Sequence, residues 1–110
     1  QLTKTGYVIG SPKYMAPEQI LGKKVDETAD IYSIGVIMYE MLTGIPPYSR
    51  GDHMSVMYQH VQGKARLCQD VNKKIPDDFA ALVGKAMSVD KSKRYQSMND
   101  LIDALNSLEL

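Results

Sequence analysis

The stretch from Asp26 to Gly44 constrains the fold more than any other part of the chain. Apolar side chains occupy most positions between its ends, so on a helix they would cover nearly the whole circumference. Asp26 is a candidate N-cap, and Gly44, with the prolines that follow it, predicts the end of the helix. A helix that is apolar all round is buried in the middle of a structure. A chain of 110 residues can hardly surround it on every side, which indicates that partner structure is missing.

Three further segments have helical periodicity, and with a loop-rich arm over 1–21 they predict an all-α fold of about four helices. The segment 52–63 is expected to bury an apolar stripe made of Met54, Met57, Tyr58 and Val61. Its opposite side carries the polar residues His53, Gln59, His60 and Gln62. The segments 77–88 and 97–108 each have one apolar stripe, and Ser97 opens the second with a capping pattern. Residues 64–75 are interpreted as a polar connection, and 18–21 as a short helical turn.

The charge balance and the cysteine content exclude several classes of protein. The chain has 13 basic and 13 acidic residues and no block of like charges, which argues against nucleic-acid binding. The single cysteine, Cys68, cannot form a disulfide framework or a zinc site, and it predicts a half-buried or buried thiol in a reducing, cytoplasmic compartment. His53 and His60 lack supporting ligands, so no metal site is expected. No apolar run reaches the ~18–20 residues of a membrane span.

Two carboxylates and a group of hydroxyls are candidates for function. Asp30, near the start of the buried helix, either interacts with the helix dipole or holds backbone N–H groups of another loop. Glu18 is either solvated or part of a buried ion pair, for which Arg94 is a candidate partner. The N-terminal hydroxyls are either ordinary loop polarity or a phosphorylatable switch segment, and they belong to Thr3, Thr5, Tyr7 and Ser11.

Four motifs, in order along the chain, resemble the C-terminal part of the protein kinase catalytic domain. The sequence G-S-P-K-Y-M-A-P-E over 10–18 resembles the end of the activation segment, which closes on the A-P-E motif. The sequence D-I-Y-S-I-G-V over 30–36 is similar to the entry into the family's central helix. The sequence L-T-G-I-P-P-Y over 42–48, and Asp90 with Arg94-Tyr95, resemble two later turns. These motifs cover nearly the whole chain. The sequences M-A-P-E-Q over 15–19 and Q-H-V over 59–61 resemble the bacterial serine/threonine branch.

The resemblance implies roles for individual residues. Ser11 would occupy the hydroxyl position that faces the catalytic aspartate and lysine of serine/threonine kinases. The substrate platform beside the acceptor residue would consist of Gly10, Ser11, Pro12, Lys13 and Tyr14. Glu18 and Arg94 would form the family's structural ion pair, and Asp30 would hold the backbone of the catalytic loop. Thr3 and Thr5 match activation-loop threonines that related bacterial kinases autophosphorylate, and Lys91 stands where the family usually has proline.

The 110 residues lack the motifs that carry out phosphoryl transfer in this family. They contain no glycine-rich phosphate loop, no H-R-D, no D-F-G and no V-A-I-K. The resemblance therefore implies a parent serine/threonine kinase that uses ATP and magnesium on protein substrates. For the fragment itself it implies no catalytic residue, no cofactor and no activity alone.

A different interpretation is a stand-alone helical binding or scaffold module that keeps a kinase-like surface without catalysis. A start codon just before Gln1 in the gene would favour this alternative. If part of the domain is missing, the uncovered faces of the central helix predict an apolar patch larger than a few hundred Å². We expect contact with the missing remainder of the domain, self-association through this exposed surface by exchange of about the first 15–25 residues between chains, and no contact with nucleic acid or a membrane.

Overall fold

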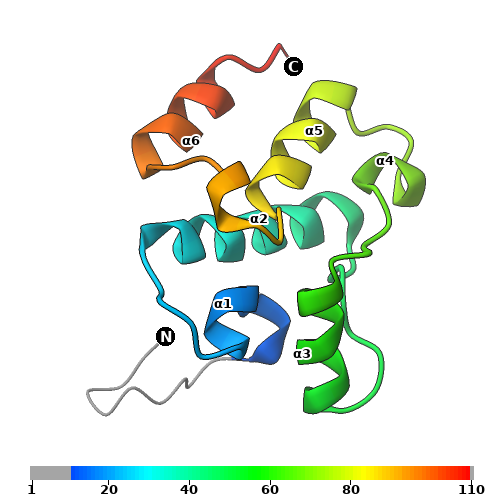
Figure 1. Ribbon diagram of the computed structural model, residues 1–110. Helices are drawn as coiled ribbons and strands as arrows, with labels where there is room; N and C mark the ends of the chain where they lie inside the picture. The colour runs from blue at the N-terminus through cyan, green and yellow to red at the C-terminus, as the bar shows by residue number, and fades with distance from the viewer. Residues whose placement is uncertain (1–10, 110) are drawn as a thin grey trace.

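The computed structural model describes residues 11–109, and within that range the fold is all-helical, as predicted, with no strand. The elements in chain order are the 3-10 turn η1 (Pro12–Tyr14), α1 (Pro17–Ile20), α2 (Glu27–Thr43), α3 (His53–Gln62), α4 (Cys68–Val71), α5 (Asp77–Ala86), the 3-10 turn η2 (Lys91–Lys93) and α6 (Met98–Asn106). Figure 1 shows α2 running across the middle of the molecule, with α4, α5 and α6 on one side and α1 and α3 on the other. The remainder of the predicted arm, 1–10, lies outside the described residues.

The central helix α2 is bounded by the capping residues that its sequence suggests. The Asp26 carboxylate accepts a hydrogen bond from the Thr28 backbone N–H at 2.9 Å, which satisfies a donor that the first turn leaves unpaired. At the other end Gly44 has φ 81°, a left-handed conformation that favours glycine, and its N–H donates to the Glu40 carbonyl at 2.8 Å. Local capping interactions therefore mark both ends of α2.

Opposite sides of α2 pack against different partners. One buried cluster joins α2 to the C-terminal helices and includes Ile31, Tyr39, Leu82, Val83, Ala86 and Leu101. The other joins α2 to the N-terminal segment and consists of Ala16, Ala29, Tyr32 and Val36. Gly35 lets α2 approach α5 closely, because a Cβ at this position would lie 2.9 Å from the Ala86 Cβ. The helix is thus the common support of both halves of the molecule.

Part of the α2 surface is nevertheless left uncovered by the described residues. Ile37 is 44% exposed and Met41 is 78% exposed, and Ile45, just beyond the helix, is 47% exposed. Ile37 and Met41 belong to the apolar run from which the buried helix was predicted, and the described chain covers only part of that run. Within residues 11–109, no helix combines the length and the hydropathy needed to cross a bilayer.

Two local predictions are wrong. Residues 64–75 contain the short helix α4, whose first residue, Cys68, is 3% exposed and packs in the core. Helix α3 turns a different side inward from the one expected, because Met54 is 72% and Tyr58 62% exposed, whereas Val56 and His60 are buried. The apolar stripe is misleading here because a buried tyrosine of α2 provides a hydrogen-bonding partner for the histidine, described below.

Candidate functional site

The site begins at the 3-10 turn η1, which corresponds to the predicted platform. Ser11 caps this turn, since its Oγ accepts a hydrogen bond from the Lys13 backbone N–H at 3.2 Å. Pro12 occupies the first position, where its missing N–H costs nothing and its fixed φ suits the turn. The side chains of Ser11 and Lys13 are exposed. The turn therefore presents a hydroxyl and a cation to solvent on a short, locally defined backbone.

Tyr14 attaches this turn to the central helix. Its hydroxyl donates to Glu40 Oε1 at 2.6 Å, and its backbone carbonyl accepts a hydrogen bond from Ser33 Oγ at 2.6 Å. The hydrogen bond to Glu40, helped by burial, raises the pKa of the Tyr14 hydroxyl, so it stays protonated and keeps donating. Neither Ser33 nor Glu40 was singled out from the sequence, because both contacts span a long stretch of chain.

His60 of α3 lies beneath the turn. It is fully buried, and its Nδ1 is 2.6 Å from the hydroxyl of Tyr32, which is also buried on α2. The Tyr48 ring meets the imidazole edge-on, with ring centroids 4.8 Å apart. Burial lowers the pKa of His60 to about 4, and the nearby backbone of Lys13 and Pro12 opposes this only in part. His60 is therefore a neutral ring packed against the backbone of η1.

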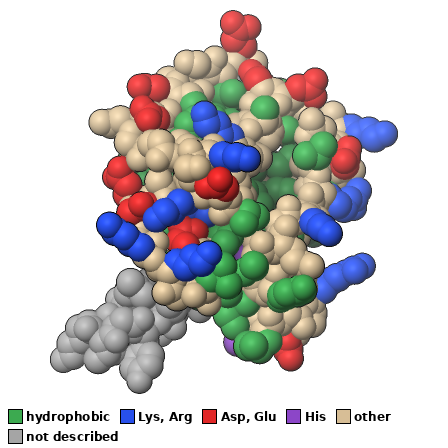
Figure 2. All heavy atoms as spheres, in the orientation of Figure 1, with side chains coloured by type: hydrophobic (Ala, Val, Ile, Leu, Met, Phe, Trp, Pro, Cys, Tyr) green, Lys and Arg blue, Asp and Glu red, His purple; other side chains and the backbone are tan. Residues whose placement is uncertain are grey.

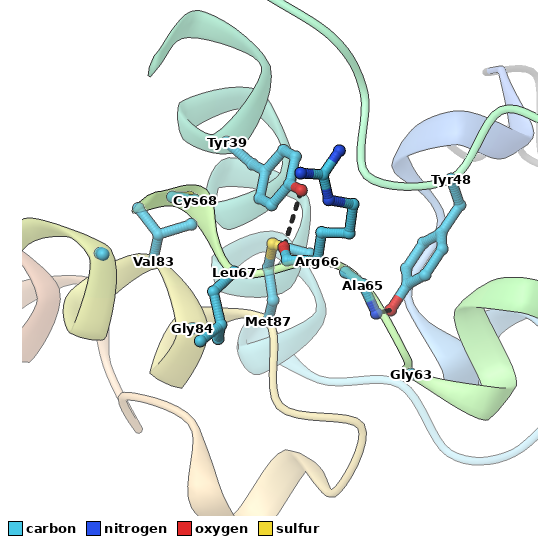
Figure 3. A pocket seen from close by; sticks show the side chains of 11 residues that line it. Tyr39, Tyr48, Gly63, Ala65, Arg66, Leu67, Cys68, Val83, Gly84 and Met87 are labelled. Carbon is cyan, nitrogen blue, oxygen red and sulfur yellow. Dashed lines mark hydrogen bonds between the residues drawn. The ribbon is translucent and has the colours of Figure 1, made fainter. Parts of the chain in front are cut away.

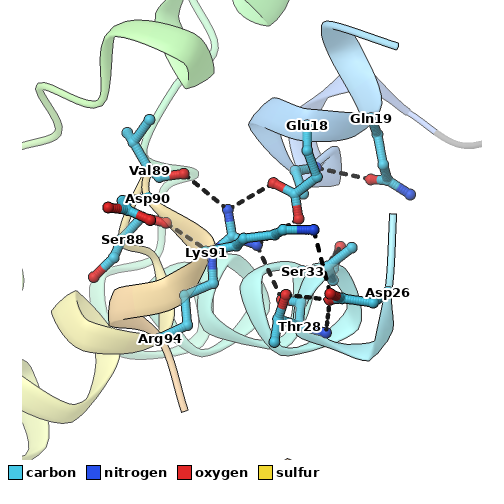
Figure 4. Close-up of polar contacts among 12 residues, drawn as sticks. Glu18, Gln19, Asp26, Thr28, Ser33, Ser88, Val89, Asp90, Lys91 and Arg94 are labelled. Atoms are coloured by element: carbon cyan, nitrogen blue, oxygen red, sulfur yellow. Dashed lines mark hydrogen bonds and ion pairs between the residues drawn. The ribbon is translucent and has the colours of Figure 1, made fainter. Parts of the chain in front are cut away.

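Glu18 and Arg94, far apart in sequence, meet in a buried ion pair (Figure 4). Arg94 Nη1 donates to Glu18 Oε2 at 2.6 Å, and Nη2 donates to Oε1 at 2.8 Å, so the contact is bidentate. Arg94 is 2% exposed and Glu18 is 6% exposed. This geometry joins α1 at the end of the platform segment to the turn before α6.

Arg94 has no unused hydrogen-bonding capacity. Its Nε donates to the Ser88 carbonyl at 2.7 Å, and its remaining Nη donors reach the carbonyls of Thr28 at 3.1 Å and Val89 at 3.2 Å. Its guanidinium also lies over the Tyr32 ring at 4.9 Å. Burial opposes ionisation of Glu18, but the hydrogen bonds and charge of Arg94 outweigh it and lower the pKa of that carboxyl. The pair is therefore charged, fully bonded and structural.

A second ion pair lies at the surface beside the first. Lys91 Nζ contacts Asp26 Oδ2 at 3.2 Å and the Lys24 carbonyl at 3.1 Å (Figure 4). The hydrogen bonds from Thr28, with the nearby Lys91 charge, lower the pKa of Asp26 to about 2. The lysine that stands in place of the family's usual proline thus connects the turn before α6 to the start of α2.

The other predicted site residues are not brought together. Asp30 is exposed, and within residues 11–109 its side chain makes no hydrogen bond. Its role in holding a catalytic loop stays a prediction. Thr3, Thr5 and Gly10 lie outside the described residues.

A separate cavity of about 170 Å³ lies between α2, α5 and the segment 63–68 (Figure 3). Its wall includes Cys68, and burial raises the pKa of that thiol. At its edge the Tyr39 hydroxyl donates to the Arg66 carbonyl at 2.7 Å. Across residues 11–109, no group of three His, Cys, Asp or Glu side chains could hold a metal ion.

Comparison with known proteins identifies the family to which this arrangement is similar. The family model described as the protein kinase domain matches residues 1–104. The probable serine/threonine-protein kinase CPE1738 of Clostridium perfringens is 35% identical over 98% of the chain. The tyrosine-protein kinase MasK of Myxococcus xanthus is 38% identical over 96% of the chain, and the serine/threonine-protein kinase PknB of Mycobacterium leprae is 38% identical over 91%. The chain spans 16% of the length of each of these three relatives.

Proposed function

The chain belongs to the protein kinase family, and we propose that the full-length protein transfers the γ-phosphate of ATP to serine and threonine hydroxyls of protein substrates. Within that activity, residues 11–14 provide the surface beside the acceptor residue. The observation that carries the proposal is the exposed Ser11 hydroxyl on a turn that Tyr14 fixes to α2 through bonds of 2.6 Å to Glu40 and Ser33. A rigid platform helps because phosphoryl transfer depends on positioning.

ATP would supply the phosphoryl group, and magnesium would neutralise its developing charge. The residues of this chain do not fit either group, because the 110 residues lack the nucleotide and metal motifs and the described part gathers no metal-binding cluster. We therefore assign no step of the reaction to this chain. The isolated 110 residues are expected to show no melting shift with ATP and magnesium and no turnover.

The chain is proposed to act as one face of a larger catalytic domain. Ile37 and Met41 are exposed on a helix that is otherwise buried, and the rest of the domain would cover them. Asp30, exposed on the same helix, is available to hold a catalytic-loop backbone from that part. Thr3 and Thr5 are proposed as autophosphorylation sites. The single thiol of Cys68 suits a cytoplasmic location for this part of the protein.

The test is a phosphotransfer assay on the full-length gene product with labelled ATP, magnesium and a mixed protein substrate. Phosphoamino acid analysis should detect phosphoserine and phosphothreonine, and phosphotyrosine alone would overturn the proposed specificity. Ser11→Thr should retain activity, because it keeps a hydroxyl at this position. Ser11→Ala should lower the rate of phosphotransfer by about tenfold or more, because the hydroxyl of residue 11 beside the substrate's acceptor residue is removed. Ser107→Ala, at an exposed serine in the last turn of the chain and away from residues 11–14, is the matched control. Equal activity of Ser11→Ala and the control would contradict the role of the platform.

A further inference from the structure

A groove outside the platform is lined by residues of the loop 45–50, of helix α3 and of the segment after α3. It has a volume of about 640 Å³, within the roughly 300–1,000 Å³ range of ligand-binding clefts. Its cationic lining residues are Arg50, Lys64 and Arg66, and no Asp or Glu is found among the described residues that line it. In Figure 2, Lys and Arg side chains stand along the right edge, beside α4 and the segment that precedes it, and a second group stands on the left.

The three cations are not neutralised by carboxylates of the described chain. The ion pairs within residues 11–109 are Lys91 with Asp26 and Arg94 with Glu18, both outside the groove. Arg66 donates from Nη2 to a backbone carbonyl, that of Asp70, at 3.0 Å. Because the whole chain has a formal net charge of zero, the groove is a local excess of positive charge.

Hydrogen bonds hold the walls of the groove together. Gln59 Nε2 donates to the Arg50 carbonyl at 2.9 Å, which joins the loop to α3. The hydroxyl of Tyr48, a buried residue, accepts a hydrogen bond from the Ala65 N–H at 3.0 Å, which joins the loop to the segment after α3. Two adjacent prolines, at 46 and 47, restrict the backbone of the loop. A groove that is already formed loses less conformational freedom on binding a partner.

We propose that this groove is a docking site for an acidic, Asp- and Glu-rich segment of a protein substrate. The identity of the occupant as a substrate rests on the proposed function, whereas its chemistry rests on the charge and shape of the groove. Helix α3 connects the two sites, because Gln59 and Gln62 line the groove while His60 lies beneath the platform. An acidic segment is favoured over nucleic acid because the positive charge is confined to a concave site and the chain has no net positive charge.

The experiment measures binding of a fluorescent peptide of alternating acidic and small polar residues to the full-length gene product by anisotropy, without ATP. A peptide with Gln and Asn in place of Glu and Asp is the ligand control. The variant carrying Arg50→Glu, Lys64→Glu and Arg66→Glu should weaken binding of the acidic peptide by about tenfold or more, because three favourable charge contacts become repulsive. Added salt should weaken binding to the wild type.

The matched protein control carries Lys23→Glu, Lys24→Glu and Lys93→Glu, which makes the same change in net charge at exposed positions outside the groove. This control should bind the acidic peptide as the wild type does. The inference would be overturned if both variants lost the same amount of affinity for the acidic peptide, or if the neutral peptide bound as well as the acidic one. It would also be overturned if the acidic peptide did not bind, or if RNA bound in its place and depended on the groove residues.

Kinetics on an acidic protein substrate separate this inference from the proposed function. The groove variant should raise KM by about tenfold and leave kcat unchanged, because the groove is away from the reacting atoms. If the protein phosphorylates substrates and the groove variant changes neither KM nor peptide binding, docking fails and the kinase activity stands. If the acidic peptide binds in the groove but no phosphotransfer occurs, the proposed function fails separately.

Discussion

Replacing Glu18 by glutamine tests the structural ion pair most directly. The substitution keeps the size of the side chain and removes its charge, so Arg94, which is 2% exposed, would remain as an uncompensated buried cation. In the wild type the two hydrogen bonds between Arg94 and Glu18 are 2.6 and 2.8 Å long, and the glutamine oxygen can still accept one of them. The three backbone carbonyls that accept hydrogen bonds from Arg94 are unchanged. Loss of one partner of a buried pair costs about 3–5 kcal/mol, and these remaining bonds favour the low end, about 3 kcal/mol.

That loss is large compared with the total stability of a domain, about 5–15 kcal/mol. Urea unfolding of the chain followed by circular dichroism would measure it as a lower midpoint at an unchanged slope. Asp26→Asn is the matched control, because it removes the charge of an ion pair of 3.2 Å whose side chains are 35% and 46% exposed. Asparagine still caps a helix and the pair is exposed to solvent, so the control should lower the urea midpoint much less than Glu18→Gln does.

The double variant Glu18→Gln with Arg94→Met isolates the coupling between the two side chains. It should be less destabilised than the sum of the single variants, since removing both charges leaves no buried ion unpaired. Glu18 has a pKa below its ordinary value of 4.5, so its contribution is present above that value and is lost as pH falls through the lowered pKa. A cost of less than 1 kcal/mol for Glu18→Gln at pH 7, or additive single variants, would refute this reasoning.

Three other substitutions or measurements address the packing around the site. The pKa of His60 is lowered from 6.5 to about 4, so the unfolded state binds more protons between these values, and the free energy of unfolding should decrease as the pH is lowered from 6.5 to about 4. His60→Gln should flatten that part of the pH profile of the unfolding midpoint. Gly35→Ala should destabilise the chain by about 1–3 kcal/mol in thermal unfolding, because the new Cβ would lie 2.9 Å from the Ala86 Cβ, whereas Gly84→Ala, where the space around a Cβ is open, should not. Cys68, which is 3% exposed with a raised pKa, should react with a thiol reagent far more slowly in the folded chain than in urea, and equal rates would contradict its burial.

The sequence predicted those features of the fold that depend on neighbouring residues. Asp26 and Gly44 define the ends of α2 through hydrogen bonds to residues two to four positions away, and Ser97 caps α6 in the same way. The all-α class follows from the same local periodicity. The ordered motifs also indicated the family, because they record residue types and spacings along the chain.

Other features depend on contacts between distant segments and appear only in the tertiary structure. The stripe of α3 predicted the wrong buried side, because whether His60 or Tyr58 faces inward depends on the hydroxyl of Tyr32, which lies on another helix. Asp30 is exposed for a similar reason, since the described chain places nothing over that side of α2.

The ion pair between Glu18 and Arg94 was suggested by the sequence, but its formation depends on the tertiary structure. The sequence supplied Glu18 and Arg94 as candidates, but a separation of 76 positions carries no information on distance. The structure brings the two side chains to 2.6 Å and surrounds the guanidinium with carbonyls of residues 28, 88 and 89. A buried charge is tolerated only when all its hydrogen bonds are satisfied at once, and that condition depends on three-dimensional packing, which no local pattern in a sequence specifies.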